Sequence, residues 1–448
     1  MTEGVMADAS SRLAAFAVET ARVPDAVRRE AIRSIMNGLA TGLAGSHDAA
    51  TLISMKVAGR FSAAGEASVI GHGKRFDLPT AAFLNAIAIN VFDFDDTHPD
   101  TILHPTAPVL PPLLALAEAM PVSGAALLDA FAIGVEVECR VANAVSPEHY
   151  RRGWHITATC GVFGAAAAAG RLLGLDAGQM LNALGIASAQ AGGLVETLGT
   201  MAKSVGVGNA ARGGLIAALL AREGMTGPAM PLEGPRGFTT VTAEDPDVSL
   251  LNEGLGKDWE LLRNTYKPYP CGVVLNPVIE AALDLAATPG FDAGKVRRAV
   301  VRGHPLLAER ADRPVPAGGR EAQVSAQHAV SVSLRHGRAG LDQFSDAAVA
   351  DAETVALRGL VSVEIDPALP VGAAVLELGL VDGSTLSRRV DQARGDSDRP
   401  MTDAEIEEKL RNLAAWGAPD VAVDLLIRAL WNLPESEETA SLARLATP

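Results

Sequence analysis

The fold class is decided by the stretch Gly161-Val-Phe-Gly-Ala-Ala-Ala-Ala-Ala-Gly-Arg-Leu-Leu173, which is almost wholly apolar and rich in small residues. A helix that is apolar all round is predicted to be buried, and small side chains let neighbouring helix axes approach closely. Similar composition recurs from about residue 8 to about 265. It predicts further helices at 25–44, 79–91, 107–119, 124–144, 178–193 and 207–223.

The hydrophobic period shortens towards two from about residue 297, which predicts strands. These are expected at 298–304, 361–365, 374–380 and 384–390, with the last two joined by the Asp382-Gly383 turn. A helix at about 323–336 interrupts them. Thr402 and Glu405 have the spacing of a capping box, and helical periodicity then continues to about residue 432.

The predicted fold is therefore mainly α, with a large all-helical domain formed by both chain ends and a smaller α+β lid domain. The expected boundaries are 1–265 for the first helical part, 266–398 for the α+β domain and 399–448 for the returning C-terminal helices. A chain of 448 residues is long enough for two domains with sizeable cores.

Composition excludes several classes of partner. The formal net charge of −15 argues against nucleic acid, because phosphate binding needs a basic face, and it also disfavours an anionic membrane surface. Residues 1–21 have no basic region before an apolar core, and no charge-free apolar run is long enough to span a bilayer. The three cysteines match no zinc or redox pattern. We expect a cytoplasmic protein.

Ionisable residues cluster in Asn90-Val-Phe-Asp93-Phe-Asp95-Asp96-Thr97-His98-Pro99, which is followed by His104-Pro-Thr106. One interpretation is a capped, solvated turn bent by its prolines. Another is a metal site, since these carboxylates and imidazoles are all acceptable ligands, although no HxH or HExxH motif accompanies them. A third is a catalytic site.

Two further candidates precede predicted helices. His155, in Gly153-Trp-His-Ile-Thr-Ala-Thr159, stands where a helix start would favour a substrate carboxylate; the alternative is a packed His bonded to a carbonyl. Lys203 lies in a Gly-rich, otherwise apolar stretch, and only seven lysines occur in the chain. Its ammonium could bind a carboxylate or act as an acid, or it could simply start a helix.

The remaining candidates lie near and within the α+β domain. Tyr266-Lys267-Pro-Tyr269-Pro-Cys271 is a Pro-stiffened segment at the predicted domain junction, where pockets are common. No base is evident for Cys271, so a buried inert thiol is expected. His328 begins the predicted helix of this domain and either caps and packs or contributes to a pocket.

Five ordered segments, 93–104, 153–164, 203–224, 266–271 and 337–344, together resemble those of the MmgE/PrpD family. This family includes 2-methylcitrate dehydratases, cis-aconitate decarboxylases and iminodisuccinate epimerases. The resemblance covers nearly the whole chain. It implies a homodimer that acts on small polycarboxylates, with no metal or organic cofactor and an active site between the two domains.

The resemblance also implies site residues. The positions that match catalytic residues are Asp93, His104, His155, Lys203 and Lys267. For substrate binding we assign Thr97, Thr159, Tyr269 and His328.

The chain departs from the family pattern at three places. Asn90 and Asn276 stand where, or close to where, many relatives have His, and His328 replaces a frequent Tyr. A His in place of Tyr would exchange a high-pKa acid for one that titrates near neutrality.

The predicted chemistry is abstraction of a proton next to a carboxylate, with His104 or His155 as base and Lys203 and Lys267 balancing the charge. Asp93 is expected to adjust the base. The predicted function is a cofactor-free lyase or isomerase, with a slight preference for an epimerase-like or uncharacterised branch. The alternatives are a metal-dependent hydrolase and a non-catalytic carboxylate-binding protein.

Overall fold

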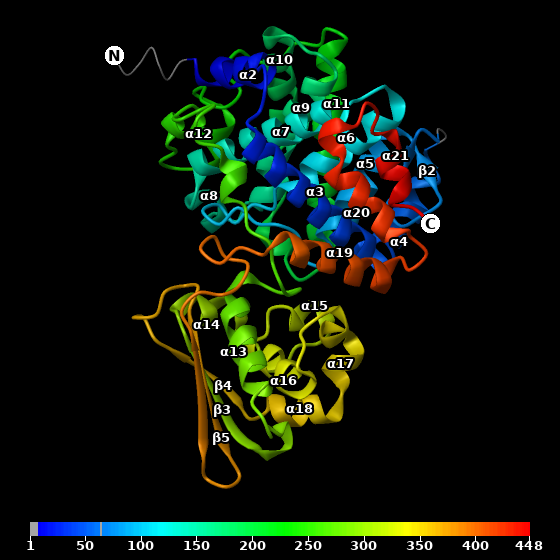
Figure 1. Cartoon of the computed structure of the whole chain (residues 1–448). Coiled ribbons are helices and arrows are strands. Elements are labelled where there is room, and N and C mark those ends of the chain that lie inside the picture. The colour runs from blue at the N-terminus through cyan, green and yellow to red at the C-terminus, as the bar shows by residue number, and fades with distance from the viewer. Residues whose placement is uncertain (1–7, 63–64) are drawn as a thin grey trace. The chain divides into compact units, whose positions relative to one another are not determined.

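The computed structural model describes residues 8–62 and 65–448 and divides the chain into two units (Figure 1). The helical unit comprises residues 1–91, 95–264 and 402–448, and the second unit comprises 92–94 and 265–401. The mainly α fold class is confirmed. The short segment 92–94 separates by its contacts from the residues on either side of it, which the sequence did not indicate.

Four long helices make the centre of the helical unit: α5 (Leu78–Asn90), α7 (Gly124–Val145), α9 (Ile156–Leu172) and α11 (Ala202–Arg222). α9 packs against both α7 and α11. The glycines explain the close approach, since a Cβ at Gly164 would lie 2.7 Å from the backbone oxygen of Gly134 and from Oε2 of Glu138. Side chains larger than hydrogen at this crossing would push α7 and α9 apart.

The other helices surround this centre. α3 (Asp25–Gly45) packs against the C-terminal α19 (Asp403–Gly417), so the two ends of the chain share one core. Thr402 and Glu405 form the predicted capping box at the start of α19. The remaining helices of seven or more residues in this unit are α2 (Ala9–Glu19), α4 (Ala49–Ala58), α6 (Thr106–Ala119), α10 (Ala177–Ser188) and α20 (Val423–Trp431).

The second unit is built on a four-stranded sheet in the order β4-β3-β5-β6. β3 (Val296–Gly303) pairs in parallel with β4 (Val361–Ile365) and antiparallel with β5 (Ala374–Leu380), which pairs antiparallel with β6 (Thr385–Val390). α13 (Asn276–Ala286) packs on β5 and β6, and α16 (Ala326–His336) packs on α13 and β4. Alternate residues of β3 and β5, such as Val301, Leu376 and Leu378, enter the resulting core.

Strand positions agree with the predictions to within two residues, whereas three helix starts do not. α16 begins at Ala326, about three residues later than predicted. α9 begins at Ile156 and α11 at Ala202, each five residues earlier than predicted. The helical unit also contains a small hairpin, β1 (Ala67–Ser68) with β2 (Arg75–Phe76), that was not predicted. The earlier helix starts matter because they place His155 and Lys203 at helix N-termini.

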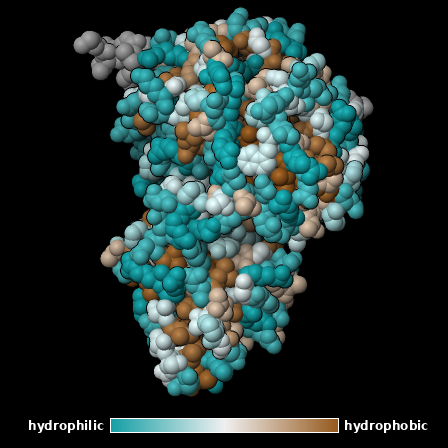
Figure 2. All heavy atoms as spheres, in the orientation of Figure 1, coloured by the Kyte–Doolittle hydropathy of each residue, from teal (hydrophilic) through white to brown (hydrophobic). Residues whose placement is uncertain are grey.

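One described helix, α11, is long and apolar enough to cross a membrane by length and composition, but 61% of its most apolar window is buried. It packs against α5 and α9, so burial accounts for its composition. Hydrophilic residues cover much of the surface visible in Figure 2, as the high content of acidic residues leads one to expect.

Candidate active site

The segment that follows α5 turns back on itself before α6 begins. The amide of His98 donates to the backbone oxygen of Leu103 at 2.8 Å, and the amide of Ile102 donates to that of His98 at 2.8 Å. Asp93 and Ile102 have φ angles of 53° and 56°, the only left-handed non-glycine residues in the described chain. Such backbone strain is tolerated where the surroundings enforce it and is common at functional sites.

This turn places His104 against the carboxylates that precede it. Nδ1 of His104 lies 2.9 Å from the backbone oxygen of Asp96 and 3.4 Å from Oδ1 of Asp95. The hydroxyl of Thr97 lies 3.4 Å from the same nitrogen, and the His104 amide donates to Oγ1 of Thr157, on α9, at 3.1 Å. An Nδ1–H that donates to a carbonyl leaves the basic lone pair of the neutral ring on Nε2.

Asp95 is the carboxylate that pairs with Nδ1 of His104, and the Asp93 carboxylate also lies close to this ring, so the role of Asp93 in adjusting the base stays a prediction. Asp95 is fully buried and accepts a hydrogen bond from Nδ2 of Asn90 at 2.8 Å. Asp93 pairs with Lys267. The sequence could not distinguish these two carboxylates because they are only two residues apart, and the left-handed turn at Asp93 decides which way each faces.

Asp96 supports the same wall from inside the core. Its Oδ2 accepts hydrogen bonds from the hydroxyl of Thr106 and from Nδ2 of Asn264, each at 2.6 Å. Burial raises the pKa of Asp96 to about 7, although both hydrogen bonds favour the ionised form. The side chain thus fixes the backbone whose carbonyl holds His104.

His98 is a support of a different kind. Its Nε2 lies 2.9 Å from Oε2 of Glu260, and its Nδ1 lies 2.9 Å from the hydroxyl of Thr101. Burial opposes ionisation of Glu260. The bond to His98 and the nearby positive charges together outweigh burial, so the pKa of Glu260 is lowered. Oε1 of Glu260 accepts from Asn143, so His98 anchors the turn to α7.

His155 and Lys203 lie at the starts of two adjacent helices. His155 is the N-cap residue of α9 and is 4% exposed, with its amide donating to the backbone oxygen of Gly193 at 3.0 Å. Lys203 is the second residue of α11 and is 9% exposed. A Cβ at Gly206 would lie 3.1 Å from that of Ala158, so the first turns of the two helices touch. Both N-termini favour an anion.

In the second unit, Lys267 pairs with Asp93. Its ammonium lies 2.8 Å from the backbone oxygen of Asp93 and 3.0 Å from its carboxylate, and the lysine is 3% exposed. Gln323 donates from Nε2 to the backbone oxygens of Phe92 and Pro270, at 2.6 and 3.0 Å. These bonds hold the segment 92–94 beside the Lys267 segment.

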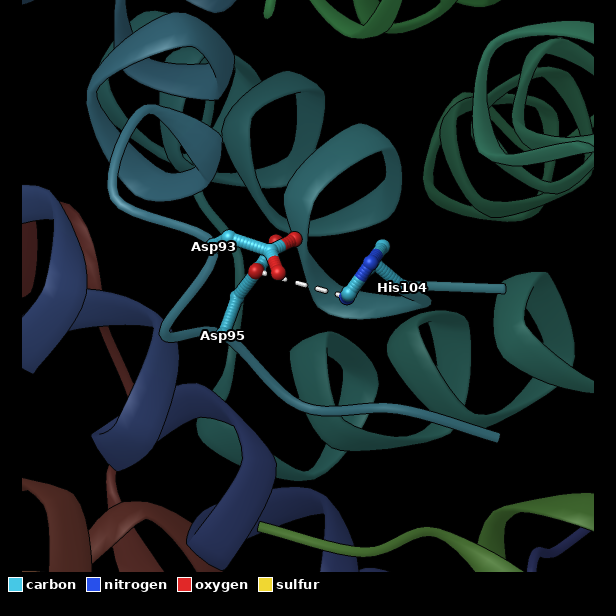
Figure 3. A group of neighbouring side chains, drawn as sticks. All are labelled: Asp93, Asp95 and His104. Atoms are coloured by element: carbon cyan, nitrogen blue, oxygen red, sulfur yellow. Dashed lines mark ion pairs between the residues drawn. The ribbon is translucent and has the colours of Figure 1, made fainter. Parts of the chain in front are cut away.

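The side chains of Asp93, Asp95 and His104 are neighbours, and one ligand atom from each lies within 4.8 Å of the others (Figure 3). Their chemistry fits a divalent cation poorly. The Lys267 ammonium already neutralises Asp93, and Asn90 donates to Asp95, so a cation would face a positive charge and displace existing bonds.

Of the other predicted substrate-binding residues, Thr159 and His328 are buried and Tyr269 is partly buried. Thr159 is engaged by Nε2 of His149 at 2.7 Å. Tyr269 packs against the core of the second unit, where burial raises the pKa of its phenol. His328 is 0% exposed, its Nε2 bonds to the backbone oxygen of Gln343, and burial lowers its pKa to about 4. The expectation that His328 titrates near neutrality is wrong, because the ring lies in the core.

Sequence reasoning missed Asn90 and Ser204 as parts of this arrangement. The hydroxyl of Ser204, next to Lys203, donates to Oδ1 of Asn90 at 3.3 Å, and Asn90 in turn donates to Asp95. A usable signal was present, because a buried Asn at the end of an apolar helix needs polar partners.

The chain is similar to known proteins over most of its length. The MmgE/PrpD N-terminal domain matches residues 11–251, and the MmgE/PrpD C-terminal domain matches residues 269–433. The cis-aconitate decarboxylase-like protein oryM of Aspergillus oryzae is 31% identical, over 94% of this chain and 93% of its own. The cis-aconitate decarboxylases of Homo sapiens and Mus musculus are each 30% identical, over 96% and 94% of this chain and 92% and 89% of theirs.

Proposed function

Because the chain belongs to the MmgE/PrpD family, we propose that it is a lyase of small di- or tricarboxylates that uses neither metal nor organic cofactor. The observation that carries this proposal is the fixed His104 ring. Its Nδ1 side faces Asp95 and Asp96, which supports Nε2 as the atom that transfers the proton.

Besides proton transfer, such a reaction needs positive charge near the substrate carboxylate, and the lysines supply it. Loss of a proton or of CO2 next to a carboxylate leaves negative charge that spreads onto that carboxylate in the transition state. Lys203, at the N-terminus of α11, and the N-terminus of α9 at His155 favour this charge. Lys267 is a further carboxylate-binding cation, with Asp93 fixing its position. His155 is the second candidate for proton transfer.

Decarboxylation is the branch that the names of these relatives favour. In an unsaturated tricarboxylate such as cis-aconitate, the electron pair of the bond to the departing carboxylate forms a new carbon–carbon double bond as CO2 leaves. The former double bond gives its electron pair to the adjacent carbon, which takes a proton from Nε2 of the His104 imidazolium and leaves the ring neutral. The ring then regains a proton from solvent. Epimerisation would need only deprotonation and reprotonation, and it stays a prediction from sequence.

We also propose that the protein is a homodimer and acts in the cytoplasm. The dimer is supported by the family resemblance and by the exposed apolar side chains Ile53, Val57 and Phe61, which are four residues apart. Light scattering on the purified chain tests the dimer, and a single-chain mass would contradict it.

The test of the activity is to incubate the purified protein with cis-aconitate, 2-methylcitrate and an aminodicarboxylate in deuterated water, and to follow CO2 release, dehydration and deuterium incorporation. We expect CO2 release that survives EDTA and falls at least a hundredfold in Lys203→Ala and His104→Ala, a typical cost of losing a proton-transfer or charge-stabilising group. Lys257→Ala, which removes an exposed lysine, is the matched control.

Three outcomes would count against the proposal. Activity lost with EDTA and restored by a divalent ion would support the metal-dependent hydrolase instead. Deuterium exchange without CO2 or water loss would support the epimerase. Tight carboxylate binding with no exchange for any candidate would support the non-catalytic alternative.

A further inference from the structure

Asn90 has no place in the chemistry proposed above, yet it is completely buried beside it. It is the last residue of α5, and both ends of its amide are used. Nδ2 donates to Oδ2 of Asp95 at 2.8 Å, and Oδ1 accepts from the hydroxyl of Ser204 at 3.3 Å. The amide therefore connects the residue beside His104 to the residue beside Lys203.

Asp95 has few other constraints. It is fully buried, and within residues 8–62 and 65–448 its Oδ1 accepts no hydrogen bond. The nearest partner of that oxygen is Nδ1 of His104, at 3.4 Å. A buried carboxylate with one free oxygen would swing or tilt if its other oxygen were released. Among the described residues, the bond from Asn90 is the one hydrogen bond that this carboxylate accepts, and it holds Oδ1 towards the imidazole.

The other groups facing His104 do not replace this restraint. The backbone oxygen of Asp96 and the hydroxyl of Thr97 approach the same Nδ1, and Thr157 binds the His104 amide. These neutral contacts orient the ring. The anionic partner that stabilises an imidazolium is Asp95, with Asp93 also close.

We propose that Asn90 is a positioning residue that holds the Asp95 carboxylate against His104 and fixes it relative to the start of α11. Asn90 acts through Asp95 and does not touch the substrate. The expected effect of Asn90 on turnover rests on the proposed function. The expected effect of Asn90 on the His104 ring does not.

A matched pair of variants tests the proposal. Asn90→Leu keeps the branched shape and the number of heavy atoms and removes the bonds to Asp95 and Ser204. Asn85→Leu makes the same change one and a half turns earlier in α5, at a residue 1% exposed whose amide bonds to Ile70 and Ser68 instead. Asp95→Asn removes the charge itself, and Ser204→Ala removes the far end of the connection with little change in volume.

Two measurements separate positioning from general destabilisation. In Asn90→Leu we expect kcat for the accepted carboxylate to fall about tenfold to a hundredfold, as is usual when a supporting partner is lost, with KM nearly unchanged. The 15N signals of the His104 ring at pH 7 should show less imidazolium in Asn90→Leu and in Asp95→Asn than in the wild type. Asn85→Leu should leave both properties as they are, and Ser204→Ala should shift both in the same direction by less.

The proposal fails if Asn90→Leu and Asn85→Leu alter the His104 signals equally, or if the loss in Asn90→Leu lies in KM. If Asn90→Leu does not fold, unchanged ring signals in both Asp95→Asn and Ser204→Ala overturn the proposal. If the wild type turns over none of the carboxylates, the proposed lyase fails, while the 15N comparison still decides the role of Asn90.

Discussion

Lys267 and Asp93 are bound to each other twice, because the ammonium contacts both the backbone oxygen and the carboxylate of Asp93, at 2.8 and 3.0 Å. This is possible because Asp93 has φ of 53°, which turns its carbonyl and its side chain towards the same nitrogen. An ordinary extended residue would present them on different sides of the chain.

The first prediction concerns this left-handed residue. Asp93→Asn should fold about as well as the wild type, since Asn tolerates this region, whereas Asp93→Ala should lose about 1–2 kcal/mol of unfolding free energy. Both should lose activity because Lys267 no longer has its carboxylate. Urea unfolding and steady-state assays measure the two effects. Equal stability of the two variants would mean that the positive φ imposes no strain.

The second prediction concerns Glu138, on α7. Neither of its carboxylate oxygens has a hydrogen-bond partner in the part of the chain that the structure describes, and burial raises its pKa well above the ordinary value. The folded protein therefore binds a proton that the unfolded chain releases above about pH 4.5. This contribution to stability is fully present below that pH and is lost as the pH rises towards the folded pKa.

The unfolding free energy of the wild type should fall as the pH rises. In Glu138→Gln this fall should be smaller by up to about 1.4 kcal/mol per pH unit, the value for one proton. Urea unfolding at pH 5.5, 6.5 and 7.5 measures the slope. Glu118→Gln is a control, because Glu118 is also buried but bonds to Ser68 and Arg75. An unchanged slope in Glu138→Gln would show that Glu138 is ionised in the folded protein.

The third prediction has the opposite pH dependence. The pKa of Glu260 is lowered, because its bond to His98 and the nearby positive charges together outweigh the effect of burial, so its contribution is present above about pH 4.5 and is lost as the pH falls below that. His98→Ala should cost about 1–3 kcal/mol at pH 7, because it leaves buried partners unsatisfied, and less at pH 4. A cost that does not change with pH would argue against an ionised Glu260.

The fourth prediction concerns the crossing of α7 and α9. Gly164→Ala should cost about 1–3 kcal/mol, because its Cβ would lie 2.7 Å from the Gly134 oxygen and from Glu138. Gly73→Ala, where a Cβ would meet nothing within 4 Å, should be nearly neutral. Thermal unfolding of both variants measures the difference, and similar melting temperatures would show that α7 and α9 separate easily.

Much of the fold was predictable because its signals are local. Strand alternation and the Asp382-Gly383 turn placed β5 and β6, and the Thr402–Glu405 pair placed the start of α19. The starts of α9 and α11, where neither N-cap residue makes a side-chain hydrogen bond, were predicted five residues too late. The β1–β2 hairpin was missed because strands of two residues carry no periodicity.

The candidate site was predictable as a set of residues but not as a set of partners. By itself, the sequence determined that carboxylates, imidazoles and scarce lysines stand at the ends of apolar helices, since these residue types and positions are written in the chain. Only the tertiary structure decided that Asp95 pairs with His104, that Asp93 pairs with Lys267, and that His328 lies in a core. These assignments depend on a left-handed turn and on burial, both of which arise from contacts between residues far apart in sequence.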